Sequence, residues 1–283
     1  MNRPTFALCL FVTAAGCSAL WPGLVRGADQ GAVFTGDLAQ LDRAAAAGDA
    51  EAQYRLGLRY RAGRGGAPRD VATAIKWLRG AAAQEHRLAQ FNLGVMYASG
   101  RGVARDDVEA VRWYRRAAEA GMAAAQNNLG TAYRDGRGVA RDYAQALHWF
   151  ALAAAQDLPP AQVNLAGLYF TGRGTARDLP QAARWFERAA HQGLAPAQNS
   201  FALMLERGEG VAQDLEDAHA WYELAANRAP VDAQAPIRAH QARVATQLSA
   251  AALAQARARA AALEQEIGRR GYLRPIRDAA GSP

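Results

Sequence analysis

The strongest constraint on the fold of this chain is an internal repeat of 36 residues. Tryptophan and aspartate each recur five times in a fixed register. The recurring residues are Trp77, Trp113, Trp149, Trp185 and Trp221, and Asp70, Asp106, Asp142, Asp178 and Asp214. An Ala-Gln pair keeps the same period, apart from one interval that is longer by a single loop residue. Regular periods of this length are typical of arrays whose units bury their apolar faces against one another, so the sequence predicts a solenoid.

Each repeat unit is predicted to form two helices. The first helix should end at a glycine that adopts the left-handed conformation. The second should begin at the periodic aspartate, which is a strong N-cap. An acid or amide three residues later predicts the reciprocal hydrogen bonds of a capping box. We expect the tryptophan and the large apolar residue after it to supply most of the buried area of the second helix.

The same register divides the chain into an array with two ends. Residues 37–49 align with a second helix that lacks tryptophan, and they are predicted to form an N-terminal capping half-repeat. Residues 230–270 are predicted to form a C-terminal helical cap, with helices over 236–247 and 249–267, and residues 271–283 a flexible tail. The five repeats between the caps are expected at 50–86, 87–122, 123–158, 159–194 and 195–229. An apolar seam on the last helix is expected to pack on the final repeat, or alternatively to pair with a second chain; a monomer is expected.

The first 27 residues have the features of an export signal. Phe6 to Ala15 form an apolar run that follows a short basic segment and is too short to span a bilayer. Signal peptidase cleavage would give a periplasmic or secreted protein. The alternative is an outer-membrane lipoprotein, because Ala14-Ala-Gly-Cys17 is similar to a lipoprotein box with Cys17 as the lipidated residue. Cys9 and Cys17 are the only cysteines, so the mature fold should contain no disulfide.

Composition and motifs argue against several functional classes. The net charge is +7, yet basic residues are interspersed with acids instead of clustering with aromatics, so nucleic acid is not an expected partner. The five histidines show no close metal-ligand spacing. The Gly-x-Gly turns follow helices and not strands, which excludes a nucleotide fingerprint. We therefore expect no catalytic residue, metal or cofactor, and no enzyme.

One repeat reads Ala-Gln-Asn-Asn-Leu-Gly-x-x-Tyr-x-x-Gly-x-Gly-Val-x-x-Asp, from Ala125 to Asp142. It resembles the Sel-1-like repeat, a tetratricopeptide-like unit. The resemblance implies an all-α fold, an α/α solenoid wound as a right-handed superhelix. It also implies an adaptor role in protein complexes and no reaction. Together with the export signal, this predicts a non-enzymatic periplasmic or secreted scaffold that binds a protein or peptide in its concave groove. One alternative is an outer-membrane-anchored assembly or regulatory protein of polysaccharide or secretion machinery. Another is the β-lactamase-like activity of cysteine-rich relatives, which the missing repeat cysteines disfavour.

The resemblance also implies candidate binding residues. In tetratricopeptide-like solenoids, an asparagine just before the leucine of the first helix faces the groove, where its amide can pair with an extended chain. Thr131 and Arg134 should lie further along this face. Alternatively, the asparagines bind no partner and instead make hydrogen bonds between helices. The asparagines in this slot are Asn92, Asn128 and Asn164. Two columns of loop arginines could attract an acidic partner, unless neighbouring aspartates pair with them. They comprise Arg101, Arg137 and Arg173, and Arg69, Arg105, Arg141 and Arg177.

Overall fold

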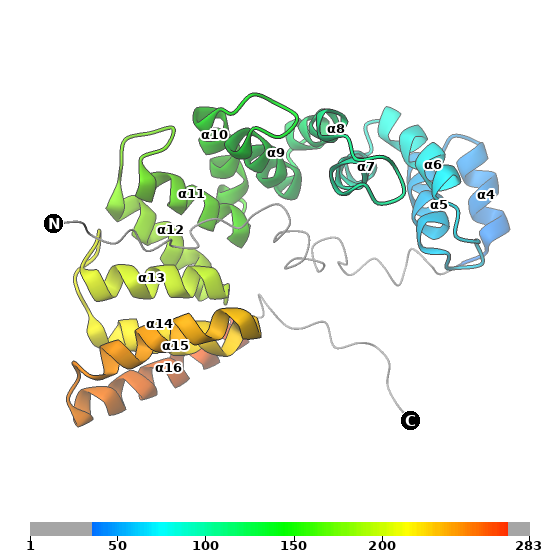
Figure 1. Cartoon of the computed structure of the whole chain (residues 1–283). Helices are drawn as coiled ribbons and strands as arrows, with labels where there is room; N and C mark the ends of the chain where they lie inside the picture. Colours follow the sequence, from blue (N-terminus) through cyan, green and yellow to red (C-terminus); the bar gives the residue numbers. More distant parts are fainter. Residues whose placement is uncertain (1–35, 271–283) are drawn as a thin grey trace, which may run out of the picture. The chain divides into compact units, whose positions relative to one another are not determined.

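The computed structural model describes residues 36–270, and this part of the chain contains thirteen α-helices and no strand. Figure 1 shows these helices coloured along the sequence. The all-α prediction is therefore confirmed for the described residues. The expected leader with Cys17 and the expected C-terminal tail lie outside them.

Ten of the described helices form five consecutive pairs. We refer to the members of each pair as the first and second helix of repeats 1 to 5. The pairs are α5 (Ala50–Ala62) with α6 (Val71–Ala83), α7 (Arg87–Ser99) with α8 (Asp107–Glu119), α9 (Ala123–Asp135) with α10 (Tyr143–Ala155), α11 (Pro159–Thr171) with α12 (Leu179–His191), and α13 (Ala195–Arg207) with α14 (Leu215–Arg228). Helix α4 (Leu38–Ala46) precedes the pairs, and α15 (Val231–Ala245) and α16 (Ala250–Arg270) follow them. The fold divides after Ala153 into two compact units, and each is described by itself.

Local turn chemistry determines where the helices begin and end. Each periodic aspartate accepts a hydrogen bond from the backbone N–H three residues later, as Asp106 does from Glu109 at 2.9 Å. A left-handed glycine with φ between 64° and 70° ends each first helix. The reciprocal half of the capping box was predicted wrongly. The Asp106 amide donates instead to the Tyr97 carbonyl at 3.0 Å, and the other four capping aspartates bond back to their own first helices in the same way.

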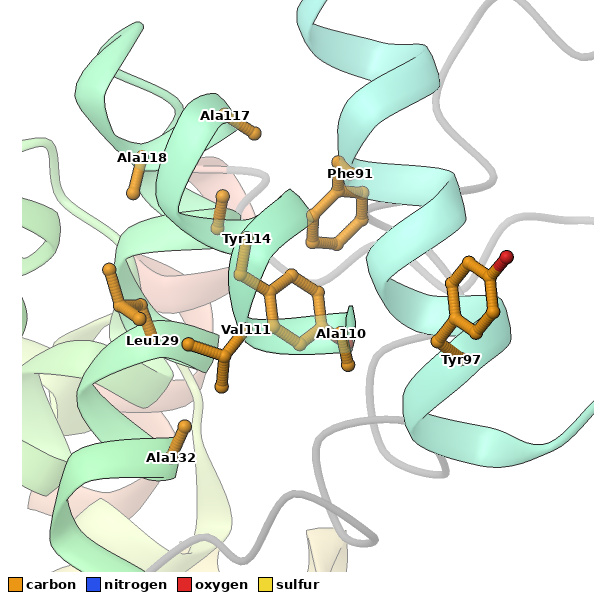
Figure 2. Close-up of a cluster of buried hydrophobic side chains, with 10 residues drawn as sticks. Phe91, Tyr97, Ala110, Val111, Tyr114, Ala117, Ala118, Leu129 and Ala132 are labelled. Carbon is orange, nitrogen blue, oxygen red and sulfur yellow. The ribbon is translucent and has the colours of Figure 1, made fainter. Parts of the chain in front are cut away.

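The core of each pair is built on the residue after the tryptophan. Leu78, Phe150 and Phe186 are fully buried. By contrast, only Trp221 among the five repeat tryptophans is buried, and the other four are half-buried. Figure 2 shows the equivalent Tyr114 beside Phe91, with Leu129 of the next repeat nearby. Of the two residues expected to supply most of the buried area, the one after the tryptophan is therefore the interior one in repeats 1 to 4, and both are interior in repeat 5.

The periodic glycine of the first helix explains how this packing is achieved. A Cβ atom at Gly94 would lie 2.6 Å from the Tyr114 ring, and one at Gly130 would lie 2.8 Å from the Phe150 ring. Because no side chain intervenes, the large residue of the second helix packs directly on the backbone of the first. The expected close approach of the two helices is confirmed for these repeats.

The periodic glutamine of the Ala-Gln pair joins successive repeats. Its side-chain amide donates to a backbone carbonyl eight residues earlier, near the end of the preceding helix. The five bonds are Gln53 to Ala45, Gln90 to Ala82, Gln126 to Ala118, Gln162 to Ala154 and Gln198 to Ala190, at 3.1–3.4 Å. A buried helix end needs partners for its last carbonyl groups, and the glutamine provides one. The sequence showed this period but not its role.

The C-terminal helices differ in part from the prediction. Helix α15 begins at Val231, five residues before the expected start at Pro236, and α16 continues past Gly268, where an end was expected. Ala233-Gln234 stands 36 residues after Ala197-Gln198, so α15 takes the position of another first helix. The predicted seam is confirmed in its main feature. Helix α16 packs on α14 and buries Ala256, Ala260, Leu263 and Ile267, while Leu253 is half-buried.

Candidate functional site: polar residues of the first helices

The three candidate asparagines occupy the sixth position of their helices but differ in exposure. Asn92 is only 2% exposed; its Nδ2 donates to the Leu88 carbonyl at 2.8 Å, and its Oδ1 accepts from Arg61 Nη1 at 2.7 Å. Both ends of this amide are therefore engaged within the chain, and the bond to Arg61 joins α7 to α5. Asn164 is also fully buried, whereas Asn128 is half-buried. Asn128 is thus the most accessible of the three.

Thr131 and Arg134 lie on α9 as expected, but both are buried. The Thr131 hydroxyl donates to the Asn127 carbonyl at 3.0 Å. Arg134 makes a two-pronged ion pair with the next residue, Asp135, from Nε at 2.7 Å and Nη2 at 3.0 Å. Both side chains have partners within the chain, and their role in binding stays a prediction.

The loop arginines are neutralised where an aspartate stands beside them. Asp107 accepts from Arg105 at 2.6 Å and from Arg137 at 3.0 Å. The hydrogen bond from Arg105, assisted by Arg137, lowers the pKa of Asp107 even though its partial burial opposes the shift. Arg177 donates instead to the Phe170 carbonyl at 3.0 Å. Around Asp107, the loop arginines are therefore paired with a neighbouring aspartate and do not form a continuous basic surface.

A histidine joins repeats 1 and 2 by three contacts that the sequence did not indicate. His86 caps α7, since its Nδ1 accepts from the Ala89 amide at 3.2 Å. Its Nε2 lies 3.0 Å from Glu51 Oε2, and its ring stacks on Tyr54 with centroids 4.6 Å apart. Burial acts to raise the pKa of Glu51, but hydrogen bonds from His86 and Arg55 outweigh it and lower that pKa. Glu51 precedes His86 by 35 residues, so no local motif could have revealed the pair.

A second polar cluster lies where α15 packs on repeat 5. The buried Tyr222 hydroxyl donates to Glu206 Oε2 at 2.7 Å, and Arg243 of α15 contacts both oxygens of Glu206 at 2.6–2.9 Å. Burial, followed by the interaction with Glu206, raises the pKa of Tyr222. The sequence did not indicate this cluster, because its members are 16 and 37 residues apart.

Two further kinds of site are absent from residues 36–270. No group of three or more His, Cys, Asp or Glu side chains in this range is placed so that it could hold a metal ion. No helix within the same residues is long and apolar enough to cross a membrane.

Paired helices with a shared capping pattern define this protein as a helical-repeat protein of the α/α solenoid class. Five consecutive matches to the Sel1 repeat model cover residues 50–86, 87–122, 123–158, 159–194 and 195–229. The chain therefore belongs to the Sel1 repeat family. Sel1 repeats typically mediate protein–protein interactions, and the family is generally a non-catalytic scaffold.

Solved structures support the same assignment. The chain is 34% identical, with a TM-score of 0.69, to a protective antigen present in uropathogenic Escherichia coli strains that displays an SLR fold. This similarity covers 82% of the chain but 48% of the antigen, so the chain spans about half the length of that relative. A Sel1 repeat protein from Oxalobacter formigenes is 31% identical with a TM-score of 0.65, over 69% of this chain and 80% of that one. No curated protein matches the chain.

Proposed function

We propose that this protein is an exported, non-enzymatic scaffold that binds a protein or peptide partner through the first helices of its repeats. The observation that carries the proposal is the run of five Sel1 repeats, because this family typically mediates protein–protein interactions. The apolar run Phe6–Ala15 supports export to the periplasm or beyond. Asn128 is the first residue to test, since it is the most accessible asparagine in the candidate slot.

The test is affinity capture from native cell envelope, with the mature protein as bait. Proteins retained by the wild type are identified by mass spectrometry, purified and titrated against the bait by calorimetry. An Asn128→Ala bait should bind the purified partner about tenfold more weakly, because a hydrogen-bonding amide is removed from the interface. Asn227→Ala is the matched control, since Asn227 is exposed on the second helix α14.

The outcomes separate the scaffold from the particular site. Equal affinities of the two variants would remove Asn128 from the interface while leaving a scaffold function in place. Failure of every captured protein to bind in the purified titration would contradict the scaffold proposal itself.

The Ala14-Ala-Gly-Cys17 box favours a second candidate, an outer-membrane-anchored assembly or regulatory protein. A lipid on Cys17 would tether the repeats to the membrane, because acyl chains supply the apolar surface that partitions into a bilayer. Mass spectrometry of the mature N-terminus in its native host tests this. A triacylated Cys17 supports the anchored form, whereas a free amine C-terminal to Cys17 excludes it.

A further inference from the structure

Arg61, at the end of α5, carries a positive charge that no described carboxylate neutralises. The side chain is half-buried, and within residues 36–270 its one hydrogen bond is the 2.7 Å contact from Nη1 to Asn92. An amide oxygen provides an acceptor but no negative charge. Withdrawing a cation from water without a counter-ion is unfavourable, so this guanidinium favours an anion beside it.

The equivalent positions in other repeats show what is missing. Arg61 is the twelfth residue of its helix, and Arg134 and Glu206 occupy the same position in repeats 3 and 5. Both are charged and both are paired, Arg134 with the following Asp135 and Glu206 with Arg243. In repeat 1 the residue after Arg61 is Ala62. The built-in carboxylate of repeat 3 is therefore absent from repeat 1.

Arg101, in the loop after α7, lacks its carboxylate for the same reason. The equivalent loop residue of repeat 3, Arg137, bonds to Asp107, the first residue of α8. The corresponding first residue of α6 is Val71. Arg101 is exposed, and it has no ion-pair partner among the residues that the structure describes. Two substitutions, one near each arginine, thus leave two positive charges uncompensated.

Arg61 and Arg101 are linked through α7, because Arg61 bonds to Asn92 of that helix and Arg101 follows its last residue, Ser99, by two positions. Burial lowers the pKa of the Arg61 guanidinium; Tyr54 opposes this shift, and the positive charge of Arg101 adds to it. The group nevertheless stays protonated at neutral pH. Asn92 is itself fixed by its bond to the Leu88 carbonyl, so it holds Arg61 in a defined orientation. Adjacent like charges without an internal anion create a local positive potential that attracts an external one.

The surroundings favour a polypeptide over a free ion. Val95 lies one turn after Asn92 on α7 and keeps part of its side chain exposed, whereas Leu58, one turn before Arg61 on α5, is buried. Apolar surface beside a cation is suited to the stem of an acidic side chain and its neighbouring backbone. A guanidinium fork also matches a carboxylate with two parallel hydrogen bonds.

We propose that Arg61 and Arg101 form an oxyanion site, oriented by Asn92, that binds a carboxylate of an acidic segment in a partner protein. The site lies where the first helices of repeats 1 and 2 end. This inference rests on the proposed scaffold function and specifies the chemistry of its partner.

The probe is a fluorescein-labelled hexaglutamate peptide with a C-terminal amide, titrated with the full mature chain at low salt and followed by anisotropy. Arg61→Gln and Arg101→Gln should each weaken binding about tenfold or more, because each removes a charge-assisted hydrogen bond. Arg64→Gln removes the same charge from a nearby exposed loop residue, and should change the affinity less than about twofold. Circular dichroism melts establish that each variant is folded.

A second variant tests the missing counter-ions without touching either arginine. Ala62→Asp combined with Val71→Asp introduces counterparts of two carboxylates of the neighbouring repeats, Asp135 of α9 and Asp107 of α8. Circular dichroism establishes that this protein is folded, since Val71 packs on the core of repeats 1 and 2. It should bind the peptide at least about tenfold more weakly, because the arginines are then paired internally. Unchanged peptide affinity in this variant, or equal losses for Arg61→Gln and Arg64→Gln, would overturn the site.

Inorganic phosphate is the competing source of oxyanion. If phosphate displaces the peptide when its concentration equals that of the peptide's glutamate residues, the assignment of the site to a polypeptide is overturned. A failed site is distinguishable from a failed scaffold. If the partner captured from the envelope binds Arg61→Gln and wild type equally, this site is wrong and the scaffold function stands.

Discussion

At the residue scale, the two glycines of each Gly-x-Gly turn have different physical roles. Gly136 ends α9 in the left-handed conformation with φ 70°. Gly138 also has a positive φ, but its greater constraint is contact, because a Cβ there would lie 2.0 Å from the Asp107 carbonyl oxygen of the preceding repeat. A Cβ would also clash with the Leu179 backbone at Gly210 and with the Val71 side chain at Gly102. The second glycine is therefore a packing contact between repeats.

Gly138→Ala is expected to destabilise the protein strongly, by about 2–6 kcal/mol, since backbone strain and overpacking each cost about 1–3 kcal/mol. Gly121→Ala is the matched control, with a similar φ of 81° but nothing within 4 Å of the added Cβ. It should show only the backbone cost. Urea unfolding of both variants gives the difference, and equal losses would contradict the packing role.

At the scale of the helix, the second helix of repeats 1 to 4 divides its two large residues between core and boundary. Phe150 is fully buried, while Trp149 is half-buried against a core cluster formed by repeats 2 and 3. Trp113 and Trp185 each have an arginine over the indole, Arg116 at 5.0 Å and Arg188 at 5.5 Å from the ring centroid. These tryptophans cover the edge of the core, and a cation shields their outer side.

Phe150→Ala should cost about 3–5 kcal/mol, because it opens a cavity beside Gly130 in the interior of repeat 3. Trp149→Ala should cost less, about 1–3 kcal/mol, because a partly exposed ring loses less buried area. Denaturant unfolding of the two single variants tests the order. A larger loss of stability for Trp149→Ala than for Phe150→Ala would contradict the placement of Phe150 as the main core residue.

At the scale of the whole molecule, the C-terminal end of the array holds two histidines whose Nδ1 atoms are buried. His219 of α14 is 4% exposed, and His240 of α15 is half-buried; in both rings Nδ1 is buried without a hydrogen-bond partner among the described residues. Burial lowers both pKa values. Arg257 adds to the effect at His219 and Glu223 opposes it; Arg243 and Arg207 add to it at His240 and Glu206 opposes it. In repeat proteins each unit depends on its neighbours, so proton uptake here should weaken the C-terminal end first.

The lowered pKa values predict the sign of the pH dependence. An unfolded histidine titrates near pH 6.5, so just below that pH the unfolded state binds more protons than the folded state. The free energy of unfolding should therefore be highest above about pH 6.5 and fall as the pH drops toward the folded pKa values. Urea unfolding between pH 7.5 and 5.5 measures this, and His219→Gln with His240→Gln should flatten the slope. His148→Gln, at an exposed position, should leave the slope unchanged. An equal slope in the wild type, the double variant and His148→Gln would contradict the assignment of the pH dependence to His219 and His240.

The sequence by itself determined the period, the helix pairs and their ends, because caps and left-handed glycines depend on residues three to five positions apart. Asp106 and Gly136 each carry such a local signature. Only the tertiary structure decided which of two adjacent aromatics is interior, as with Trp149 and Phe150. It also decided which polar side chains are already paired: Asn92 with Arg61 and Asp107 with Arg137, 31 and 30 residues apart. Periodicity places such residues in register, but packing against the neighbouring repeat determines their contacts.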